Sequence, residues 1–295
     1  MNIYILPNLQ KENSELYIRK AADLLRNNNA ELSMAKKYQA DFSDLDFITF
    51  SDEDNLVSQC DVILAVGGDG TILKASSVAS KYEKPILGLN CGRLGFMCTL
   101  EHNELELLEN LCKGDYVINK RIMLDGEITK KDGSKKVFTA LNDIVVSKPP
   151  HSKISDFEVS KSGKIVSSIR ADGLIFSTPT GATAYSLSAG GPIIEPDMEC
   201  IEFTPICPHS LLSRTMIFSK ASKLSVKFFT NSDECFGLSV DGVTKDDISS
   251  KETLTISTSE KYIKLIDIKG GSFFDSVNSK LMRPLKAVME DNDNV

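Results

Sequence analysis

The stretch that most constrains this chain is an apolar run that ends in a glycine-rich turn. Val62-Ile63-Leu64-Ala65 leads directly into Val66-Gly67-Gly68-Asp69-Gly70-Thr71. An apolar run bounded by glycines is typical of a buried strand, and residues 71–79 that follow have helical spacing. A strand, a glycine turn and a helix start together form an anion site, because unpaired N–H groups and the helix dipole point at the turn.

Asp69 places a carboxylate in the middle of this turn. A negative charge among phosphate-binding amides is unfavourable unless the carboxylate binds a metal or accepts a proton. The structural alternative is a tight turn in which Asp69 caps the helix. The turn alone leaves both uses open.

The first part of the chain alternates between strand-like and helix-like segments. Short apolar runs predict strands at Ile3–Leu6, Asp61–Val66 and Pro85–Leu89, and helical spacing predicts helices at 12–28, from Thr71 onward and at Glu104–Cys112. This alternation predicts a parallel sheet with helices on its faces. We expect this α/β domain to span residues 1–120.

The pattern changes near residue 120 to short strand-like runs separated by turns. Asp132-Gly133 and Ser162-Gly163 each lie between two such runs and indicate hairpins. Further runs lie at Leu224–Thr230, Cys235–Val240, Thr253–Ser257 and Tyr262–Ile268, with turns at Asn231-Ser232-Asp233 and Asp241-Gly242. We therefore expect antiparallel sheets packed on each other over residues 121–270. A helix at Asp275–Leu281 is expected to return residues 271–295 to the first domain, and Glu290–Asn294 is expected to fray.

Composition argues against several classes of protein. The net charge of −7 argues against a nucleic-acid-binding surface, and no apolar run is long enough to span a bilayer. The seven cysteines form no C-x-x-C pair and have no zinc spacing with the three histidines. We therefore expect no metal held by protein ligands, and we expect reduced core thiols in a cytoplasmic protein.

A second unusual segment runs from Asp172 to Pro192 and is rich in Thr, Ser and Gly, with Tyr185 among them. Small hydroxyl side chains make short, directional hydrogen bonds. Tyr185 could stack on a base and offer its hydroxyl at the edge. The structural alternative is a Ser/Thr-rich loop that caps a helix.

Taken together, these motifs closely resemble the bacterial ATP-dependent NAD kinases. The matching pieces are Gly67-Gly68-Asp69-Gly70-Thr71, Gly92-Arg93-Leu94-Gly95-Phe96, Leu141-Asn142-Asp143, residues 178–186, residues 206–214 and Val240-Asp241-Gly242. The glycine-aspartate turn is shared with lipid kinases and phosphofructokinases, whereas the Thr-Pro-Thr-Gly-x-Thr-Ala-Tyr-Ser segment is far more specific. The resemblance implies an N-terminal Rossmann-like α/β domain, a C-terminal β-sandwich-like domain and an active site between them.

The resemblance also implies a reaction, the transfer of the γ-phosphoryl of ATP to the 2′-hydroxyl of the adenosine ribose of NAD. A sugar hydroxyl is a poor nucleophile at neutral pH, and a carboxylate within hydrogen-bond reach can accept its proton. Asp69 matches the family's general base, and Gly67, Gly68 and Gly70 would leave room for the phosphates. A divalent ion, Mg²⁺ by default, would bridge phosphate oxygens.

The remaining cofactor-binding positions carry over residue by residue. Lys74 would neutralise phosphate charge. Asn142 and Asp143 match the family's Asn-Glu pair for ribose hydroxyls, with Asp143 one methylene shorter than the usual Glu. Asp172 would accept from the nicotinamide carboxamide. The other positions matched to dinucleotide contacts are Lys153, Arg170, Thr183, Ala184, Tyr185, Ser186, Leu187 and Ser188.

These assignments have structural alternatives. Lys74 and Lys153 could be solvated lysines, the pair at 142–143 could cap a strand end, and Arg170 could pair with Asp172, two residues away.

The sequence departs from the common family pattern at two positions. Ala182 stands where Ser is more usual. Val243 stands where some relatives have a polar residue that touches NAD, so Val243 is not a site candidate. His209 has apolar neighbours and is expected in the core, whereas His102 and His151 are expected at the surface.

Two other functions stay open from sequence, a lipid kinase of the diacylglycerol type and a catalytically silent dinucleotide-binding regulator. The net negative charge of the chain argues against the lipid kinase, which would need an apolar or basic surface that faces a membrane. Asp69 argues against the second, because a mere binder gains nothing from a carboxylate beside phosphates. Since the family is usually oligomeric, we expect a homodimer or homotetramer that takes ATP and NAD as small-molecule substrates, with no nucleic-acid or membrane partner.

Overall fold

A computed structural model describes residues 1–92, 95–149, 152–210, 212–229, 235–271 and 273–281. The chain divides into two compact units. Unit 1 comprises Met1–Lys120 with Ile263–Val295, and unit 2 comprises Arg121–Tyr262. The chain passes from one unit to the other along two long strands, β7 (Val117–Thr129) and β18 (Thr253–Asp267).

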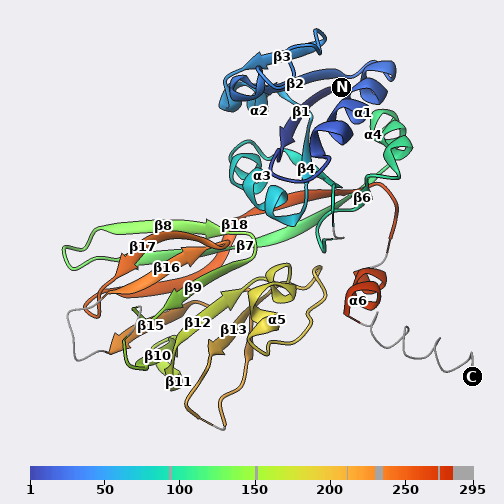
Figure 1. The fold of residues 1–295 in the computed structure, drawn as a ribbon. Coiled ribbons are helices and arrows are strands. Elements are labelled where there is room, and N and C mark those ends of the chain that lie inside the picture. Colours follow the sequence, from blue (N-terminus) through green and yellow to red (C-terminus); the bar gives the residue numbers. More distant parts are fainter. Residues whose placement is uncertain (93–94, 150–151, 211, 230–234, 272, 282–295) are drawn as a thin grey trace, which may run out of the picture. The chain divides into compact units, whose positions relative to one another are not determined.

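Unit 1 is an α/β unit built on a parallel sheet (Figure 1). The strands stand in the order β5-β4-β1-β2-β3, with the end of β18 and the short β6 both parallel to β5. Its elements are β1 (Asn2–Pro7), α1 (Ser14–Asn27), β2 (Glu31–Ala35), β3 (Ile48–Ser51), α2 (Glu53–Gln59), β4 (Val62–Gly67), α3 (Asp69–Tyr82), β5 (Pro85–Asn90), β6 (Leu100–Glu101), α4 (Leu108–Lys113) and α6 (Phe273–Leu281), with 3-10 turns at Lys36–Tyr38 and Leu105–Leu107.

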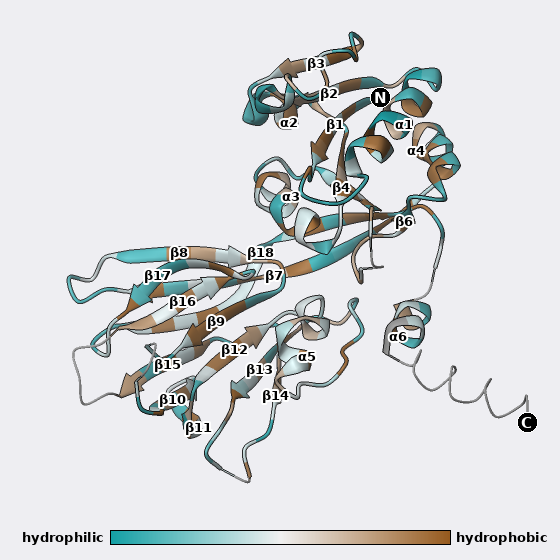
Figure 2. Ribbon diagram, in the orientation of Figure 1, coloured by the Kyte–Doolittle hydropathy of each residue, from teal (hydrophilic) through white to brown (hydrophobic). Residues whose placement is uncertain are grey.

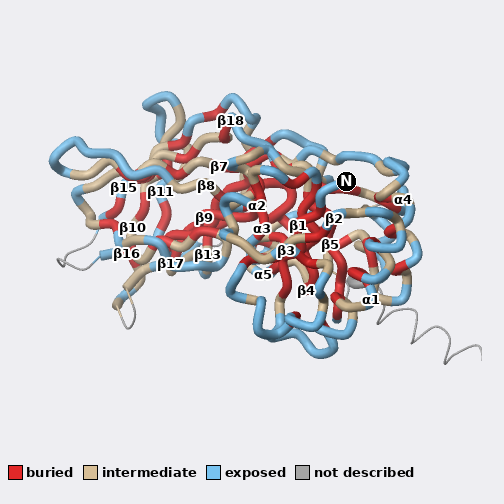
Figure 3. The backbone as a smooth tube through the Cα atoms, turned by 90° about the horizontal axis from the view of Figure 1, so that it is seen from above, coloured by how far each residue is buried: buried red, intermediate tan, exposed pale blue. Residues whose placement is uncertain are grey.

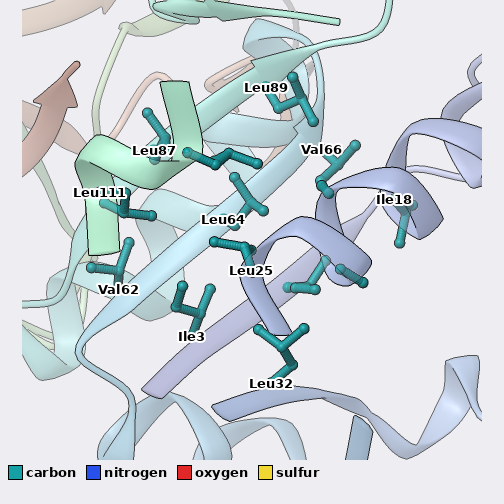
Figure 4. Close-up of a cluster of buried hydrophobic side chains, with 14 of the residues drawn as sticks. Ile3, Ile18, Leu25, Leu32, Val62, Leu64, Val66, Leu87, Leu89 and Leu111 are labelled. Atoms are coloured by element: carbon teal, nitrogen blue, oxygen red, sulfur yellow. The ribbon is translucent and has the colours of Figure 1, made fainter. Parts of the chain in front are cut away.

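The core of unit 1 forms because apolar strands meet amphipathic helices. Strand β4 is buried along its whole length, and α1 carries both apolar and polar bands along its axis (Figure 2). Side chains of Ile3 and Leu64 on the sheet point toward Leu25 on α1 and Leu111 on α4 (Figure 4). The helices therefore cover a face of the sheet that the sequence makes apolar.

Unit 2 is built from antiparallel strands that form two layers. One sheet has the order β14-β13-β12-β9-β16-β17, and the other contains β11-β10-β15-β18 with β7 and β8. Buried side chains from both sheets share one core, and the strands carry most of the buried backbone (Figure 3). Its elements are β8 (Lys135–Ala140), β9 (Asp143–Ser147), β10 (Ser155–Lys161), β11 (Lys164–Ala171), β12 (Gly173–Ser177), a 3-10 turn (Gly181–Thr183), α5 (Tyr185–Ser188), β13 (Cys200–Ile206), β14 (Met216–Ser219), β15 (Leu224–Phe229), β16 (Phe236–Val240) and β17 (Val243–Ile248).

The hairpin turns of unit 2 contain left-handed residues. Gly133 has φ 82°, Ser162 and Gly163 have φ 51° and 78°, and Asp241 and Gly242 have φ 49° and 76°. Two successive positive φ angles are what a two-residue hairpin loop requires, and Ser162-Gly163 and Asp241-Gly242 have them. Asp132-Gly133 lies in a longer connection between β7 and β8, where Gly133 N–H donates to Lys130 O at 3.0 Å. The three turn predictions are therefore confirmed. The turn expected at Asn231-Ser232-Asp233 and the fraying of Glu290–Asn294 lie outside the described residues.

Two expectations about the fold are wrong. The runs Thr253–Ser257 and Tyr262–Ile268 belong to one continuous strand, β18, because the polar residues between them include no Gly or Pro to break it. The cysteines are not all in the core, since Cys207 and Cys235 are exposed. All seven are free thiols.

Adjacent phenylalanines on β15 test the unit 2 core. Phe228 is 2% exposed and its ring centroid lies 5.0 Å from that of Phe236, whereas Phe229 is 50% exposed. We expect Phe228→Ala to lower the free energy of unfolding of unit 2 by about 3–5 kcal/mol. Phe229→Ala should cost less than about 1 kcal/mol, since half of its surface is already in water. Urea unfolding followed by far-UV circular dichroism measures both, and equal losses would contradict this assignment of the core.

Candidate active site

In unit 1 the chain leaves β1 toward β2 and later returns to β4 on the other side of β1. This reversal is a topological switch point, where ligands of open parallel sheets bind beyond the carboxyl ends of the strands. Asn8 follows β1 at this point, and its N–H donates to Val66 O at 3.0 Å. The Gly67–Asp69 turn follows β4.

Gly67 is a glycine because of packing within the protein. A Cβ there would overlap the Thr71 hydroxyl and the side chain of Asn8. Asn8 Nδ2 donates to that hydroxyl at 3.2 Å, so the three residues tie the ends of β1 and β4 to the first turn of α3. Gly67 is also buried, which differs from the expectation that its role is to make room for phosphates.

The other two glycines of the turn leave space at the start of α3. A Cβ on Gly70 would meet nothing within 4 Å, and one on Gly68 would meet Asn90 Oδ1 at 3.9 Å. Helix α3 is 14 residues long, so its dipole favours an anion at this end. Lys74, one turn further along, is exposed.

Asp69 accepts three backbone hydrogen bonds from a loop that follows β5. Phe96 N–H donates to Oδ2 at 2.6 Å, and Met97 and Cys98 N–H donate to Oδ1 at 3.1 and 3.2 Å. A Cβ on Gly95 would overlap this carboxylate, so the loop approaches Asp69 closely because residue 95 is glycine. Gly68 occupies the N-cap position of α3 and Asp69 is the first residue of the helix, which removes the alternative of Asp69 as a helix cap.

In unit 2, Asn142 and Asp143 form a buried turn that enters β9. They are 7% and 5% exposed. Asp241 holds this turn, since its Oδ1 accepts from the N–H groups of Asn142 at 2.7 Å and Asp143 at 3.2 Å, and its Oδ2 accepts from Leu141 N–H at 2.9 Å. Thr178 adds a further tie by donating its hydroxyl to Leu141 O at 2.6 Å.

The side chains of this turn have fewer hydrogen-bond partners than its backbone. Asn142 Oδ1 is buried without a hydrogen-bond partner among the described residues. Burial, with the Asp241 carboxylate nearby, raises the pKa of Asp143 to about 7. A buried acceptor without a donor is costly, and such groups often mark a place where a ligand completes the bonding.

The residues of the segment Thr183–Ser188 differ in how far they are exposed to solvent. Tyr185 is 46% exposed, and Ser188 is also exposed. Ser186 is fully buried, and its hydroxyl donates to Glu202 Oε1 at 2.8 Å. Thr183, Ala184 and Leu187 are half-buried. Ser186 therefore faces the protein interior, whereas Tyr185 faces solvent.

The charged candidates of unit 2 have partners that the sequence did not indicate. Arg170 lies opposite Asp156 across β10 and β11 and binds it with two nitrogens, at 2.8 and 2.9 Å. The expected alternative pair between Arg170 and Asp172 is therefore wrong. Asp172 instead lies 3.2 Å from Lys148 Nζ, and Lys153 is exposed.

Some residues at these sites were missed from sequence. Asn8 directly follows the apolar strand β1 and Asn90 is the last residue of the apolar strand β5, and that position is the signal that could have found them. Lys148 likewise follows β9 directly. Asp241 was noted as part of a turn, but its contacts reach about a hundred residues back, so no local pattern indicates them.

The histidine expectations are also revised. His209 is exposed rather than in the core, and its backbone N–H donates to Arg170 O at 2.8 Å. His102 is half-buried against Tyr17, with ring centroids 4.8 Å apart. His151, like Arg93 and Leu94 of the third motif, lies outside the described residues.

Over the described ranges, no three His, Cys, Asp or Glu side chains converge as metal ligands would. Among the same residues, none of the helices combines the length and apolar character that crossing a membrane demands.

Comparison with known proteins connects both units to one family. A family model of the ATP-NAD kinase N-terminal domain matches residues 5–116, and a model of the ATP-NAD kinase C-terminal domain matches residues 141–268. An NAD kinase from Caldanaerobacter subterraneus subsp. tengcongensis is 38% identical over 227 residues, which cover 77% of this chain and 80% of that protein. One from Natranaerobius thermophilus is 33% identical over 281 residues, covering 95% and 97%. The chain belongs to the ATP-NAD kinase family.

Solved structures agree with this membership of the NAD kinase family. The crystal structure of yeast NADH kinase complexed with NADH covers 96% of this chain at a TM-score of 0.86 and 24% identity, with 87% of that chain covered. An NAD kinase from Archaeoglobus fulgidus in complex with ATP covers 96% of this chain at a TM-score of 0.73 and 25% identity, with 99% of that chain covered. The predicted family and the predicted fold class, an α/β unit plus a β-sandwich-like unit, are confirmed.

Two glycines in one loop test how Asp69 is held. We expect Gly95→Ala to push the loop off the carboxylate and to destabilise unit 1 by about 1–3 kcal/mol, because the new methyl group overlaps Asp69. Gly92→Ala is the matched control, since a Cβ there meets nothing within 4 Å. Hydrogen exchange of the Phe96, Met97 and Cys98 amides should accelerate only in the first variant. Equal protection in both variants would contradict the close approach.

The buried Asp143 predicts a pH dependence of stability. Its pKa is raised to about 7, whereas an unfolded aspartate titrates near about 3.9, so the folded chain binds more protons between these values. This contribution lowers the free energy of unfolding as pH rises from about 4 to about 7. We expect the stability of Asp143→Asn relative to the unmodified chain to increase over that window, by at least about 1 kcal/mol.

Asp156→Asn is the control for this pH experiment. The Arg170 guanidinium lowers the pKa of Asp156, so that variant should gain no relative stability as pH rises. Denaturant unfolding at a series of pH values measures both variants. Parallel curves for the Asp143 variant and the unmodified chain would contradict the burial argument.

Proposed function

We propose that this chain is an NAD kinase that transfers the γ-phosphoryl of ATP to the 2′-hydroxyl of the adenosine ribose of NAD, with Asp69 as the general base. The observation that carries the proposal is the position of Asp69, a carboxylate at the N-terminal end of α3, held by three amides beside an anion-binding helix start. The relatives named NAD kinase support the reaction itself.

The start of α3 would receive the phosphates of ATP. Its first N–H groups and its dipole favour negative charge, and Gly68 and Gly70 carry no side chain that would block the approach. Lys74 is exposed one turn along the helix and would act as a mobile positive charge.

Asp69 has one acceptor position left for a substrate hydroxyl. A carboxylate offers about four lone-pair sites on its two oxygens. Oδ1 accepts two amide bonds and Oδ2 accepts one, so the remaining site is on Oδ2. A ribose 2′-hydroxyl that donates there would pass its proton to Asp69 while its oxygen bonds to the γ-phosphorus. The bond from that phosphorus to the bridging oxygen breaks, and ADP leaves.

Unit 2 would hold the dinucleotide. The unpartnered Asn142 Oδ1 needs a hydrogen-bond donor, and the ribose hydroxyls of NAD supply donors. Asp143 beside it offers further acceptors. Tyr185 is exposed enough to stack on a ring, and Asp172 would accept from the carboxamide while it keeps its contact with Lys148.

The two cations contribute differently in this proposal. Lys153 is exposed and free to approach the pyrophosphate. Arg170 would have to share its guanidinium with Asp156, so its effect on NAD affinity should be smaller.

Mg²⁺ does not fit a resident site on the described side chains, because no acidic or imidazole cluster is present among them to hold it. An Mg²⁺ ion held by the phosphate oxygens of ATP would neutralise part of their charge.

The Asp69→Asn variant tests the proposed base. We expect kcat for NADP formation to fall by about 10²- to 10⁴-fold, because the amide cannot accept the proton. NAD binding, measured by calorimetry, should change far less than kcat, because Asn keeps an acceptor oxygen for the 2′-hydroxyl and the other assigned dinucleotide contacts are on other residues. Gly95→Ala is the control for a displaced loop, because it keeps the carboxylate.

Three outcomes of these measurements are decisive. Near-normal turnover by Asp69→Asn would remove the base assignment. NAD binding without NADP formation by the unmodified chain would favour the silent regulator. Activity that depends on lipid would favour the lipid kinase.

A further inference from the structure

The outer face of β13 carries an unusual set of side chains. Ile201 and Phe203 point into the unit 2 core, so Cys200, Glu202 and Thr204 lie on the opposite face. This face is covered as well, because Cys200 packs in a small buried cluster with Ala182 and Ile194, both from the segment that contains α5.

Glu202 is the centre of a buried polar network on this face. It is fully buried, and its Oε1 accepts from the Ser186 hydroxyl at 2.8 Å and from the Thr204 hydroxyl at 3.3 Å. The Ser186 and Thr204 hydroxyls are 2.8 Å apart, and Thr204 in turn lies 3.0 Å from the Thr215 hydroxyl. A Cβ on Gly191 would overlap Glu202 Oε1, so the chain after α5 also closes over the carboxyl group.

A carboxyl group in this position is costly for stability alone. Glu202 Oε2 is buried without a partner among the residues that the structure describes. Burial raises the pKa of Glu202 to about 7, against the opposing effect of the two hydroxyl donors. An apolar residue of similar volume would avoid this cost, which suggests a use other than stability.

We propose that Glu202 is a positioning residue for NAD, which fixes the orientation of the Tyr185–Ser188 turn by accepting the hydroxyl of Ser186 beneath it. The proposal rests on the function proposed above, in which Tyr185 and its neighbours contact the dinucleotide.

The contacts of the turn support this role. Its backbone bonds are local, from Ala189 N–H to Tyr185 O and from Gly191 N–H to Ser186 O. Within the described part of the chain, the side-chain hydrogen bonds that tie α5 to β13 all start at Ser186 Oγ. Since Tyr185 is next to Ser186 and exposed, a change in how Ser186 is held would rotate Tyr185 away from its ligand-facing orientation.

Substitutions at Glu202 separate positioning from packing. Glu202→Leu fills the site with apolar volume but leaves Ser186 without its acceptor. We expect KM for NAD to rise about tenfold, with KM for ATP and kcat within about twofold, and with stability unchanged or higher. Glu202→Gln keeps an acceptor oxygen for Ser186, so its KM for NAD should stay within about threefold of the unmodified enzyme.

Thr215→Val is the matched control for network loss. It removes the hydroxyl at the far end of the network, which contacts Thr204 but not Ser186. KM for NAD should not change in this variant. A rise equal to that of Glu202→Leu would show that general loosening, rather than the Ser186 contact, sets the affinity, and would overturn the proposal.

The pH profile is a readout that a purely structural Glu202 would not move. Ionisation of Glu202 makes its Oε1 a charged and therefore stronger acceptor for the Ser186 hydroxyl, whereas the amide in Glu202→Gln stays neutral, so KM for NAD of Glu202→Gln should rise relative to the unmodified enzyme above about pH 7. We expect the ratio of the KM of Glu202→Gln to that of the unmodified enzyme to increase at least about threefold between about pH 6 and about pH 8.5.

Other titrating groups do not confound this ratio. The titratable group beside Glu202 on its own strand is Cys200, and burial raises the pKa of its thiol above its ordinary value. The groups that face Glu202 from α5 and from the stretch before β14, Ser186 and Thr215, do not titrate in this range. Asp143 is present in both proteins, so its ionisation cancels in the ratio. A ratio that stays constant with pH would overturn the proposal.

Failure of this inference is distinguishable from failure of the proposed function. If the unmodified chain forms no NADP, the proposed reaction is wrong, and NAD affinity by calorimetry still tests Glu202. If the unmodified chain is active and Glu202→Leu has an unchanged KM for NAD, only the positioning role is wrong.

Discussion

Both candidate sites depend on an aspartate that accepts three backbone N–H groups from a distant part of the chain. Asp69 binds the amides of residues 96–98, and Asp241 binds those of residues 141–143. Charge-assisted bonds of this kind are roughly twice as strong as neutral ones. Asp69 thus orders a loop that has no regular secondary structure, and Asp241 orders the turn that enters β9.

The two aspartates differ in whether they keep an acceptor position for a ligand. Asp69 is itself partly exposed and keeps one acceptor position, so the carboxylate that holds the loop is also the proposed base. Burial raises the pKa of Asp241 despite its three donors, and its work is to present Asn142 and Asp143. The first is therefore suited to chemistry and the second to binding. Phosphoryl transfer to a dinucleotide requires a positioned substrate and a group that accepts the proton of its hydroxyl, and the two aspartates match these two requirements.

The sequence predicted those features that depend on local pattern. Strand β4 and helix α3 followed from the apolar run and the glycine turn, and the hairpins followed from Asp-Gly and Ser-Gly pairs that favour positive φ. The pairing of Arg170 with Asp156 needed strand register, because these residues face each other only after β10 and β11 are aligned. Strands β2 and β3 were missed, since their short, mixed segments form strands through the pairing of β2 with β1 and of β3 with β2. Helix α2 was also missed, and it is only seven residues long.

Motif membership alone also did not separate ligand-facing residues from supporting ones. Gly67 and Ser186 lie inside the two most informative motifs, yet the space at Gly67 is filled by Thr71 and Asn8, and the hydroxyl of Ser186 is bonded to Glu202. Asn142 lies in a shorter motif and has a buried oxygen with no partner among the described residues. The contacts therefore separate these three residues where the motifs do not. Gly67 and Ser186 are occupied by contacts within the protein and support the site, whereas the buried oxygen of Asn142 has an unfilled acceptor position where a ligand donor is expected to bind.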